Sequence, residues 1–293
     1  MSPAPSKPRR RIVKAGLAGA AWMILPPGLG IEPPPQSPPA PAAPPSIPTG
    51  HSHNDYYRRR PLHEALDLGF GSIEVDVFPV DGDLLVGHHP AELTPDRTLD
   101  RLYLEPLLAR CRAAKEPTTG PRPAGGRLTL LIDLKRDGER ALEILRPALK
   151  PLKPWLRRIE GERLIDGPIE IVLSGSRPMD AVASESNRLV FIDGRVEDLD
   201  RDPSPNLVPM ISSAMHSALG TYGITGLNDA ALARLEALVT RTHEQGRRLR
   251  FWGHLESTKV WKGLVTAGVD HIGTDRPELL ARWLRANDPR CGP

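Results

Sequence analysis

Short apolar runs recur along the chain from residue 47 onward. Most of them are rich in Val, Ile and Leu and end at glycine, proline or polar residues, as buried strands do. They predict strands over 47–51, 72–80, 128–135, 169–174, 189–193, 207–212, 249–254 and 271–275. Segments with helical periodicity lie between most of these runs, for example over 61–68, 138–152, 229–245 and 277–286.

The regular alternation of strands and helices predicts an α/β fold. Eight short strands that are apolar on both faces favour a closed parallel barrel over an open sheet. We therefore expect a single (β/α)8 TIM-type barrel. The link over 194–206 has several acidic residues and no apolar period, so the helix expected there should be missing or degenerate.

The first 48 residues predict an export segment followed by a spacer. The basic stretch KPRRRIVK (7–14) precedes an apolar run over 15–31, which is the order of a targeting signal. Its arginine pair resembles that of a twin-arginine (Tat) signal. We expect a periplasmic or extracellular protein, held at a membrane surface if residues 1–31 are not removed. Nearly every second residue over 32–48 is proline, which predicts an extended linker, and a barrel domain over 49–293 follows.

The charge distribution argues against a nucleic-acid partner. The net charge is +3, but the first 48 residues contain five basic residues and one acidic residue, so the remainder carries −1. A near-neutral domain lacks the basic surface that contacts a phosphate backbone. The two cysteines, Cys111 and Cys291, have neither metal-binding spacing nor a disulfide framework. No pattern in the sequence predicts an oligomeric state.

Carboxylates near the ends of two predicted strands indicate a metal site. Glu74 and Asp76 are two residues apart on a strand, so both side chains face the same side and can share one hard cation. Asp133, near the end of the next strand, can complete a three-carboxylate site for one divalent cation, Mg²⁺ or Ca²⁺. The alternative is an ordinary strand with a polar face in solvent, but a barrel strand has no such face.

Histidines at the same predicted strand ends are candidates for acid–base catalysis. His51, in the segment HSHND, can exchange protons near neutral pH, and His88 follows a turn that returns the chain toward the same end of the barrel. Packing or capping roles are the alternatives. His53 and Asn54 can contact a substrate or stabilise the turn.

Phosphodiester cleavage also needs positive charge near the transition state, and Lys135 can supply it together with the cation. Trp252, near the end of the seventh predicted strand, can line the pocket or pack in the core. With His53 and Asn54, these residues form the predicted substrate-binding set.

The order HSHND, ExD, DGxLLVGHH, LLIDLK and GVDHIGTDRP resembles the phospholipase C-like phosphodiesterase superfamily. This superfamily includes glycerophosphodiester phosphodiesterases, phosphatidylinositol-specific phospholipases C and spider-type sphingomyelinases D. The opening HSHNDY, followed by PLHEALDLGFGSIEVDV, is most similar to the branch with the fungal altered-inheritance-of-mitochondria proteins. The resemblance spans 49–284. It implies a metal-dependent phosphoric diester hydrolase with catalytic histidines His51 and His88, metal ligands Glu74, Asp76 and Asp133, and a basic residue at Lys135.

The sequence departs from the glycerophosphodiesterase pattern at its opening motif, at a ligand segment and at His89, where the relatives usually have aspartate. It opens with HSHND where those enzymes have HRG, and it lacks their Glu-Asn-Thr ligand segment. The three-carboxylate set instead resembles the metal site of the sphingomyelinases D. We therefore expect a lipid-derived or small organic phosphodiester as substrate, and glycerol diesters are the weaker choice.

Two other functions remain open from the sequence. In a transition-metal hydrolase of the polymerase-and-histidinol-phosphatase or amidohydrolase kind, His51 and His53 would bind the metal with further histidines, for which His216, His254 and His271 are only loosely placed. A non-catalytic barrel could also keep the fold without the chemistry. Such a barrel could have His51 and His88 at opposite ends, or Asp133 turned away from Glu74.

Overall fold

The structure is a computed structural model that describes residues 46–114 and 126–291. The predicted export segment and residues 32–45 of the predicted linker lie outside the described residues. The first strand, β1 (Ile47–Ser52), begins two residues before the expected start of the domain at 49. No helix in the described ranges is long and apolar enough to cross a bilayer.

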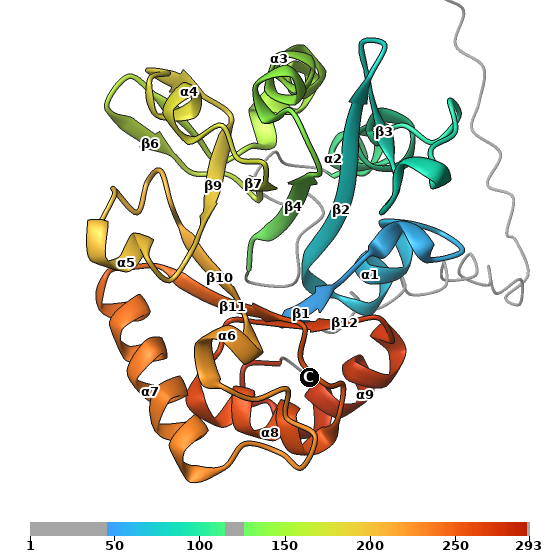
Figure 1. The fold of residues 1–293 in the computed structure, drawn as a ribbon. Coiled ribbons are helices and arrows are strands. Elements are labelled where there is room, and N and C mark those ends of the chain that lie inside the picture. Colours follow the sequence, from blue (N-terminus) through green and yellow to red (C-terminus); the bar gives the residue numbers. More distant parts are fainter. Residues whose placement is uncertain (1–45, 115–125, 292–293) are drawn as a thin grey trace, which may run out of the picture. The chain divides into compact units, whose positions relative to one another are not determined.

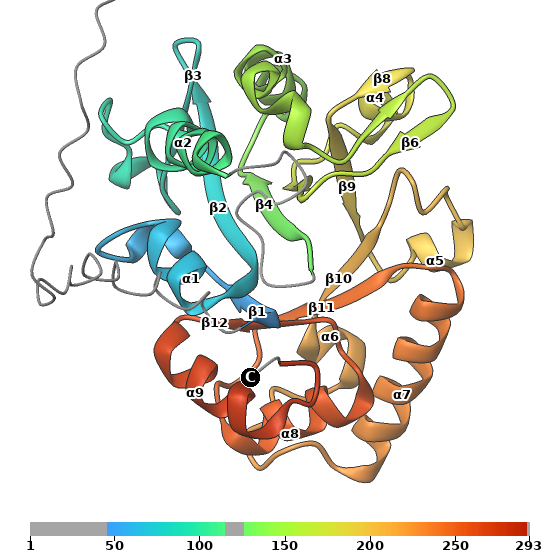
Figure 2. The same ribbon diagram turned by 180° about the vertical axis from the view of Figure 1, so that it is seen from behind.

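Eight parallel strands close into a barrel (Figures 1 and 2). Strand β1 pairs with both β12 and β2, and this double pairing closes the ring. The predicted (β/α)8 TIM-type fold is confirmed. The barrel strands are β1, β2 (Phe70–Val80), β4 (Leu128–Leu134), β7 (Ile169–Gly175), β9 (Val190–Gly194), β10 (Met210–Ala214), β11 (Arg248–Trp252) and β12 (His271–Thr274).

Helices follow the strands and cover the outside of the barrel (Figure 1). The side chain of Asn228 accepts a hydrogen bond from Ala231 N at 2.9 Å and caps the start of α7, whereas Gly69, with φ 83°, ends α1. As expected, the link after β9 holds only the four-residue helix α5. The helices are α1 (His63–Leu68), α2 (Glu105–Ala113), α3 (Gly138–Leu149), α4 (Met179–Ala183), α5 (Asp198–Arg201), α6 (Met215–Leu219), α7 (Asp229–Glu244), α8 (Thr258–Ala267) and α9 (Pro277–Asn287).

A hairpin that the sequence analysis did not predict as paired strands extends β2. Strand β3 (Asp83–Val86) pairs antiparallel with the end of β2. Asp81 and Gly82 connect the two strands with φ values of 50° and 93°, as the two central residues of a tight hairpin turn require. Because β3 runs antiparallel to β2, the segment after β3, which includes His88, returns to the level of Asp76 and Val77.

Two further features differ from the sequence-based expectation. Strand β10 begins at Met210, directly after Pro209, which has no N–H to donate, and its pairing with β11 extends to Ala214, two residues beyond the predicted end at 212. The second difference is a separate three-stranded sheet outside the barrel. Its strands are too short to give a periodic signal: β5 (Arg158–Glu160), β6 (Arg163–Ile165) and β8 (Asn187–Arg188).

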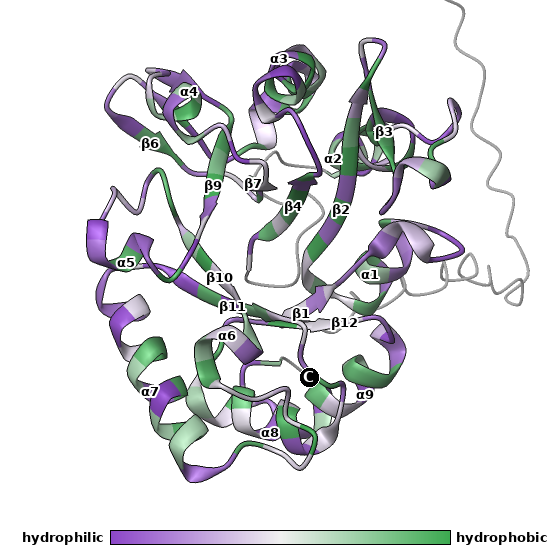
Figure 3. Ribbon diagram, viewed as in Figure 1, coloured by the Kyte–Doolittle hydropathy of each residue, from purple (hydrophilic) through white to green (hydrophobic). Residues whose placement is uncertain are grey.

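The main hydrophobic core lies between the barrel strands and the helices. On β2, Ile73, Val75 and Val77 belong to this core, whereas the alternate residues Glu74 and Asp76 face the inside of the barrel. Figure 3 shows hydrophobic and hydrophilic residues alternating along the strands. The second apolar cluster among the described residues is much smaller: Leu131, Ile159, Val172, Phe191 and Met210. The inside of the barrel contains polar as well as apolar side chains.

Candidate active site

Three carboxylates meet inside the carboxyl end of the barrel. Asp76 on β2 stands beside Asp133 on the neighbouring strand β4, and Glu74 precedes Asp76 on the same face. One carboxylate oxygen from each residue lies within 4.8 Å of the other two. The structure thus brings together the three residues predicted as metal ligands.

The environment of this acidic cluster fits a hard divalent cation. Asp76 Oδ1 is buried and has no hydrogen-bond partner, and a buried carboxylate oxygen rarely lacks one. Burial raises the pKa of Asp133, and the negative charges of Asp76 and Glu74 add to this effect, although the ammonium group of Lys135 opposes it. A cation held by the three carboxylates would satisfy the unpaired oxygen and relieve the repulsion between them.

Lys135 forms ion pairs with two carboxylates of the cluster. Its Nζ lies 2.7 Å from Asp76 Oδ2 and 3.2 Å from Asp133 Oδ2. The hydroxyl group of Tyr56 donates to the same Asp76 oxygen at 2.8 Å. Asp76 Oδ2 is therefore fully engaged by the protein, which leaves Oδ1 for a ligand.

His51 is completely buried beside Glu74. Its Nδ1 lies 2.7 Å from Ser72 Oγ, and its Nε2 lies 3.1 Å from both Glu74 Oε2 and Arg250 Nε. If Nε2 carries the proton, it donates to Glu74. If Nε2 is unprotonated, it accepts from Arg250 Nε instead, so the tautomer decides which of the two contacts is a hydrogen bond. Burial, and then the positive charge of Arg250, lower the pKa of His51 to about 4.

His88 approaches the cluster from the β3 side. Its Nδ1 lies 2.8 Å from Asp76 Oδ2, and its backbone N–H donates to Glu92 Oε2 at 2.8 Å. The side chain is 41% exposed, unlike that of His51. Both predicted catalytic histidines therefore lie at the same end of the barrel, and each contacts a different carboxylate of the acidic cluster.

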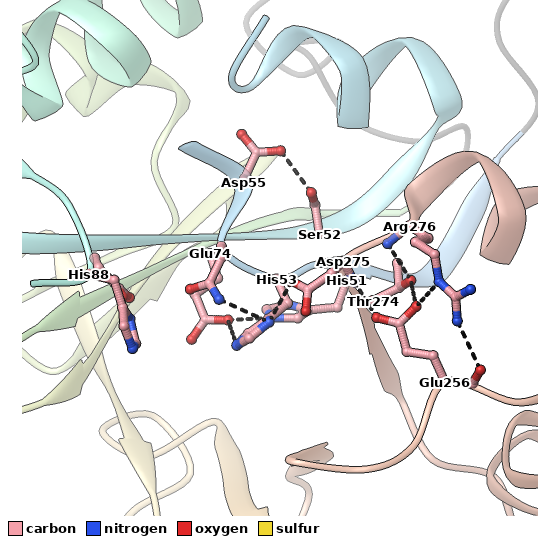
Figure 4. Close-up of polar contacts among 12 residues, drawn as sticks. His51, Ser52, His53, Asp55, Glu74, His88, Glu256, Thr274, Asp275 and Arg276 are labelled. Atoms are coloured by element: carbon pink, nitrogen blue, oxygen red, sulfur yellow. Dashed lines mark hydrogen bonds and ion pairs between the residues drawn. The ribbon is translucent and has the colours of Figure 1, made fainter. Parts of the chain in front are cut away.

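His53 and Asn54 line the mouth of the barrel. His53 Nδ1 lies 2.9 Å from Asp275 Oδ1, and its Nε2 lies 3.8 Å from Glu74 Oε2 (Figure 4). Burial lowers the pKa of His53, but the hydrogen bond with Asp275 and the charge of Glu74 outweigh burial, and the pKa lies above its ordinary value. Asn54 adopts φ 46°, and its side-chain oxygen lies 2.8 Å from the hydroxyl oxygen of Tyr56.

A cavity of about 270 Å³ opens over the acidic cluster. Trp252, which is 46% exposed, stands in its wall. All the predicted site residues except the buried His51 line this cavity. The lining residues are His53, Asn54, Glu74, Asp76, His88, Asp133, Lys135, Ser174, Arg195, Arg250 and Trp252.

Three residues of the site were not predicted from the sequence: Arg250, Tyr56 and Arg195. Arg250 is two residues before Trp252, so strand alternation places both side chains on the same face of β11, and this signal could have found it. Tyr56 directly follows HSHND, but its contact with Asp76 depends on the left-handed turn at Asn54. Arg195 lies beyond the end of β9 in the irregular link, where no periodic pattern places a side chain.

The histidine arrangement does not favour the transition-metal alternative. In the described part of the chain, the ligand cluster consists of carboxylates alone. His216 stacks on Tyr222, with ring centroids 4.3 Å apart. His271 is buried with its ring centroid 6.3 Å from that of His51, and neither of its nitrogens has a hydrogen-bond partner.

The barrel and its acidic mouth define a protein with the fold of the glycerophosphodiester phosphodiesterases. A solved glycerophosphodiester phosphodiesterase from Parabacteroides distasonis superposes with a TM-score of 0.52 and 16% sequence identity, covering 81% of this chain and 97% of that chain. At this identity the likeness concerns the fold alone.

Sequence comparison places the chain in a particular family. The AIM6-like phosphodiesterase domain matches residues 45–193. The altered inheritance of mitochondria protein 6 homolog of Arthroderma benhamiae is 34% identical over 253 residues, which cover 77% of this chain and 80% of that protein. The corresponding protein of Eremothecium gossypii is 29% identical over 266 residues, covering 80% of this chain and 68% of that protein. The chain belongs to the AIM6-like phosphodiesterase family, and the resemblance inferred from its motifs is confirmed.

Proposed function

We propose that this protein is a metal-dependent phosphodiesterase that cleaves a lipid-derived or small organic phosphodiester by histidine acid–base catalysis. The observation that carries the proposal is the placement of two histidines around one acidic cluster. His51 contacts Glu74, and His88 contacts Asp76, so the two imidazoles reach the cluster through different carboxylates. Membership of a phosphodiesterase family supports the same reaction class.

The carboxylates of Glu74, Asp76 and Asp133 would hold one Mg²⁺ or Ca²⁺ ion. When bound, this ion would supply positive charge to the phosphoryl oxygens. The protein's own groups would perform the proton transfers. One histidine would take a proton from the attacking water or substrate hydroxyl, and the other would give a proton to the leaving oxygen.

The cavity wall supports a phosphodiester as ligand. Lys135, Arg195 and Arg250 bring three cationic side chains to a space of about 270 Å³, next to the indole ring of Trp252. Cationic side chains suit a phosphoryl group, and an exposed aromatic face suits the apolar part of a substrate.

The experiment is a screen of lipid and small organic phosphodiesters with Mg²⁺ or Ca²⁺, followed by phosphorus NMR. We expect turnover that a chelator abolishes reversibly, and we expect His51→Ala and His88→Ala to reduce it by about 10²–10⁴-fold, the usual contribution of an acid–base group. His243→Ala is the matched control, because His243 on α7 is 42% exposed and pairs with Asp270 instead of the acidic cluster. Wild-type rates in both His51→Ala and His88→Ala would exclude the proposed chemistry.

A further inference from the structure

Arg250 places a buried positive charge in the lining of the cavity. The residue is 3% exposed, and its side chain faces the inside of the barrel. A buried guanidinium group is stable only where partners compensate for the loss of water. Its partners are His51, 3.1 Å from Nε, and Glu74, whose Oε2 accepts a hydrogen bond from Nη2 at 2.7 Å.

These partners leave part of the guanidinium group free. An arginine side chain carries five N–H donors. Nη1 of Arg250 makes no hydrogen bond to any residue that the structure describes, and the side chain lines the cavity above the acidic cluster. Lys135 lines the same cavity but is already bound to two carboxylates. Arg250 therefore has an uncommitted donor on a side chain that lines this cavity.

Arg248, two residues earlier on β11, provides an internal comparison. Its side chain also faces the inside of the barrel, but Nη1 donates to Thr129 Oγ1 at 2.8 Å and Nη2 donates to the buried carboxylate of Glu170. Both terminal nitrogens of Arg248 are satisfied by the protein, as expected of an arginine with a structural role. Arg250 differs because its terminal Nη1 is left for a partner outside the protein.

We propose that Arg250 binds the phosphoryl group of the substrate through Nη1 and orients the His51 ring through Nε. This assignment rests on the proposed function of the site. A guanidinium group donates strong, directional hydrogen bonds to phosphoryl oxygens, and Arg250 remains protonated throughout, so it contributes charge and geometry without transferring a proton. The hydrogen bond from Nη2 to Glu74 also restrains the guanidinium group.

The test measures inorganic phosphate binding to the full chain in the presence of Mg²⁺, by calorimetry, for Arg250→Met and Arg250→Lys. Loss of a charge-assisted hydrogen bond should weaken phosphate binding by about 10- to 100-fold in Arg250→Met. Arg248→Lys, the control, should keep the wild-type Kd. Wild-type phosphate binding in Arg250→Met would overturn the assignment. If Arg250→Met does not fold, Arg250→Lys decides, because its ammonium group cannot reproduce the planar fork: weaker phosphate binding supports the assignment and an unchanged Kd overturns it.

Turnover separates this inference from the proposed function. If the wild-type protein cleaves a phosphodiester, Arg250→Met should lower kcat, whereas Arg248→Lys should not. Equal kcat values in wild type and Arg250→Met would overturn the role of Arg250 but leave the proposed function intact. If no phosphodiester is cleaved but phosphate binding depends on Arg250, the phosphoryl-binding role stands and the hydrolase proposal fails.

Discussion

Asp133→Asn tests the acidic cluster without removing any apolar contact. The substitution keeps the size of the side chain and removes one of the three negative charges that lie within 4.8 Å of one another. Loss of a residue that merely supports a metal ligand costs about 10- to 100-fold in metal affinity, so loss of a direct ligand should cost at least as much. The assay is thermal unfolding with and without Mg²⁺ or Ca²⁺.

The magnitude follows from binding linkage. At a free metal concentration of 100 times Kd, the wild-type protein should gain about 2.7 kcal/mol of unfolding free energy, which raises Tm by about 5–11 °C in a domain of this size. If Asp133→Asn raises Kd 10- to 100-fold, the same concentration gives only about 0.4–1.4 kcal/mol. Glu236→Gln, which removes an exposed carboxylate on α7, is the control and should keep the full shift.

The pH dependence of stability in the absence of metal gives a second, independent test. Burial and the neighbouring carboxylates raise the pKa of Asp133 in the folded protein. A carboxyl group with a raised folded pKa is destabilising when ionised, so wild-type stability falls as the pH rises through that pKa. Metal-free Asp133→Asn should therefore be at least as stable as wild type at pH 7, with a smaller loss of stability between acidic and neutral pH. The reasoning is refuted if the variant keeps the full metal-dependent Tm shift.

Two other predictions concern the support of the cluster and the first residues of the chain. Gly175 has φ 67°, and a Cβ there would lie 2.0 Å from Asp133 Oδ1, so Gly175→Ala should displace this carboxylate and reduce the metal-dependent Tm shift. Gly161→Ala is the control, because Gly161 has φ 63° with open space around it; this variant should be strained but keep the metal-dependent Tm shift. Equal Tm shifts in the two variants would contradict the steric argument. Replacing Arg9 and Arg10 by lysine should block export of a reporter fused to residues 1–48 if the segment is a Tat signal, and unimpaired export would argue against it.

The barrel could be predicted because its strands and helices leave separate signals. The helix over 229–245 begins at an asparagine cap and ends near Gly246, and the structure places α7 at 229–244. The strand over 128–135 is confirmed as β4 with a difference of one residue. Elements without such signals were not predicted: β5, β6 and β8 are at most three residues long, so their pairing depends on tertiary contacts.

The carboxylates of the site could be predicted because strand position and residue type agree. Glu74 and Asp76 interrupt an apolar run just before the pairing of β2 with β4 ends, and Asp133 lies near the carboxyl end of β4, where a TIM barrel gathers its polar loops. The position of His88 depends on the turn at Asp81 and Gly82, which could be recognised from the sequence, and on the short strand β3, which could not. The sequence did not indicate that His51 would be completely buried, because burial there depends on Ser72, Glu74 and Arg250 from two other strands.

Arg250 shows why the sequence left part of the site unassigned. In the segment RLRFW, Leu249 and Phe251 belong to the core beneath the helices, so the arginines at the alternate positions must face the inside of the barrel. The usual interpretation of such alternation is the reverse, with apolar residues inside and charged residues in solvent. A closed barrel covered by helices has no solvent face along its strands, so polar residues at alternating positions are interior residues. The same argument applies to β2 and β4, and it makes the charged inward positions of all three strands the first residues to examine for function.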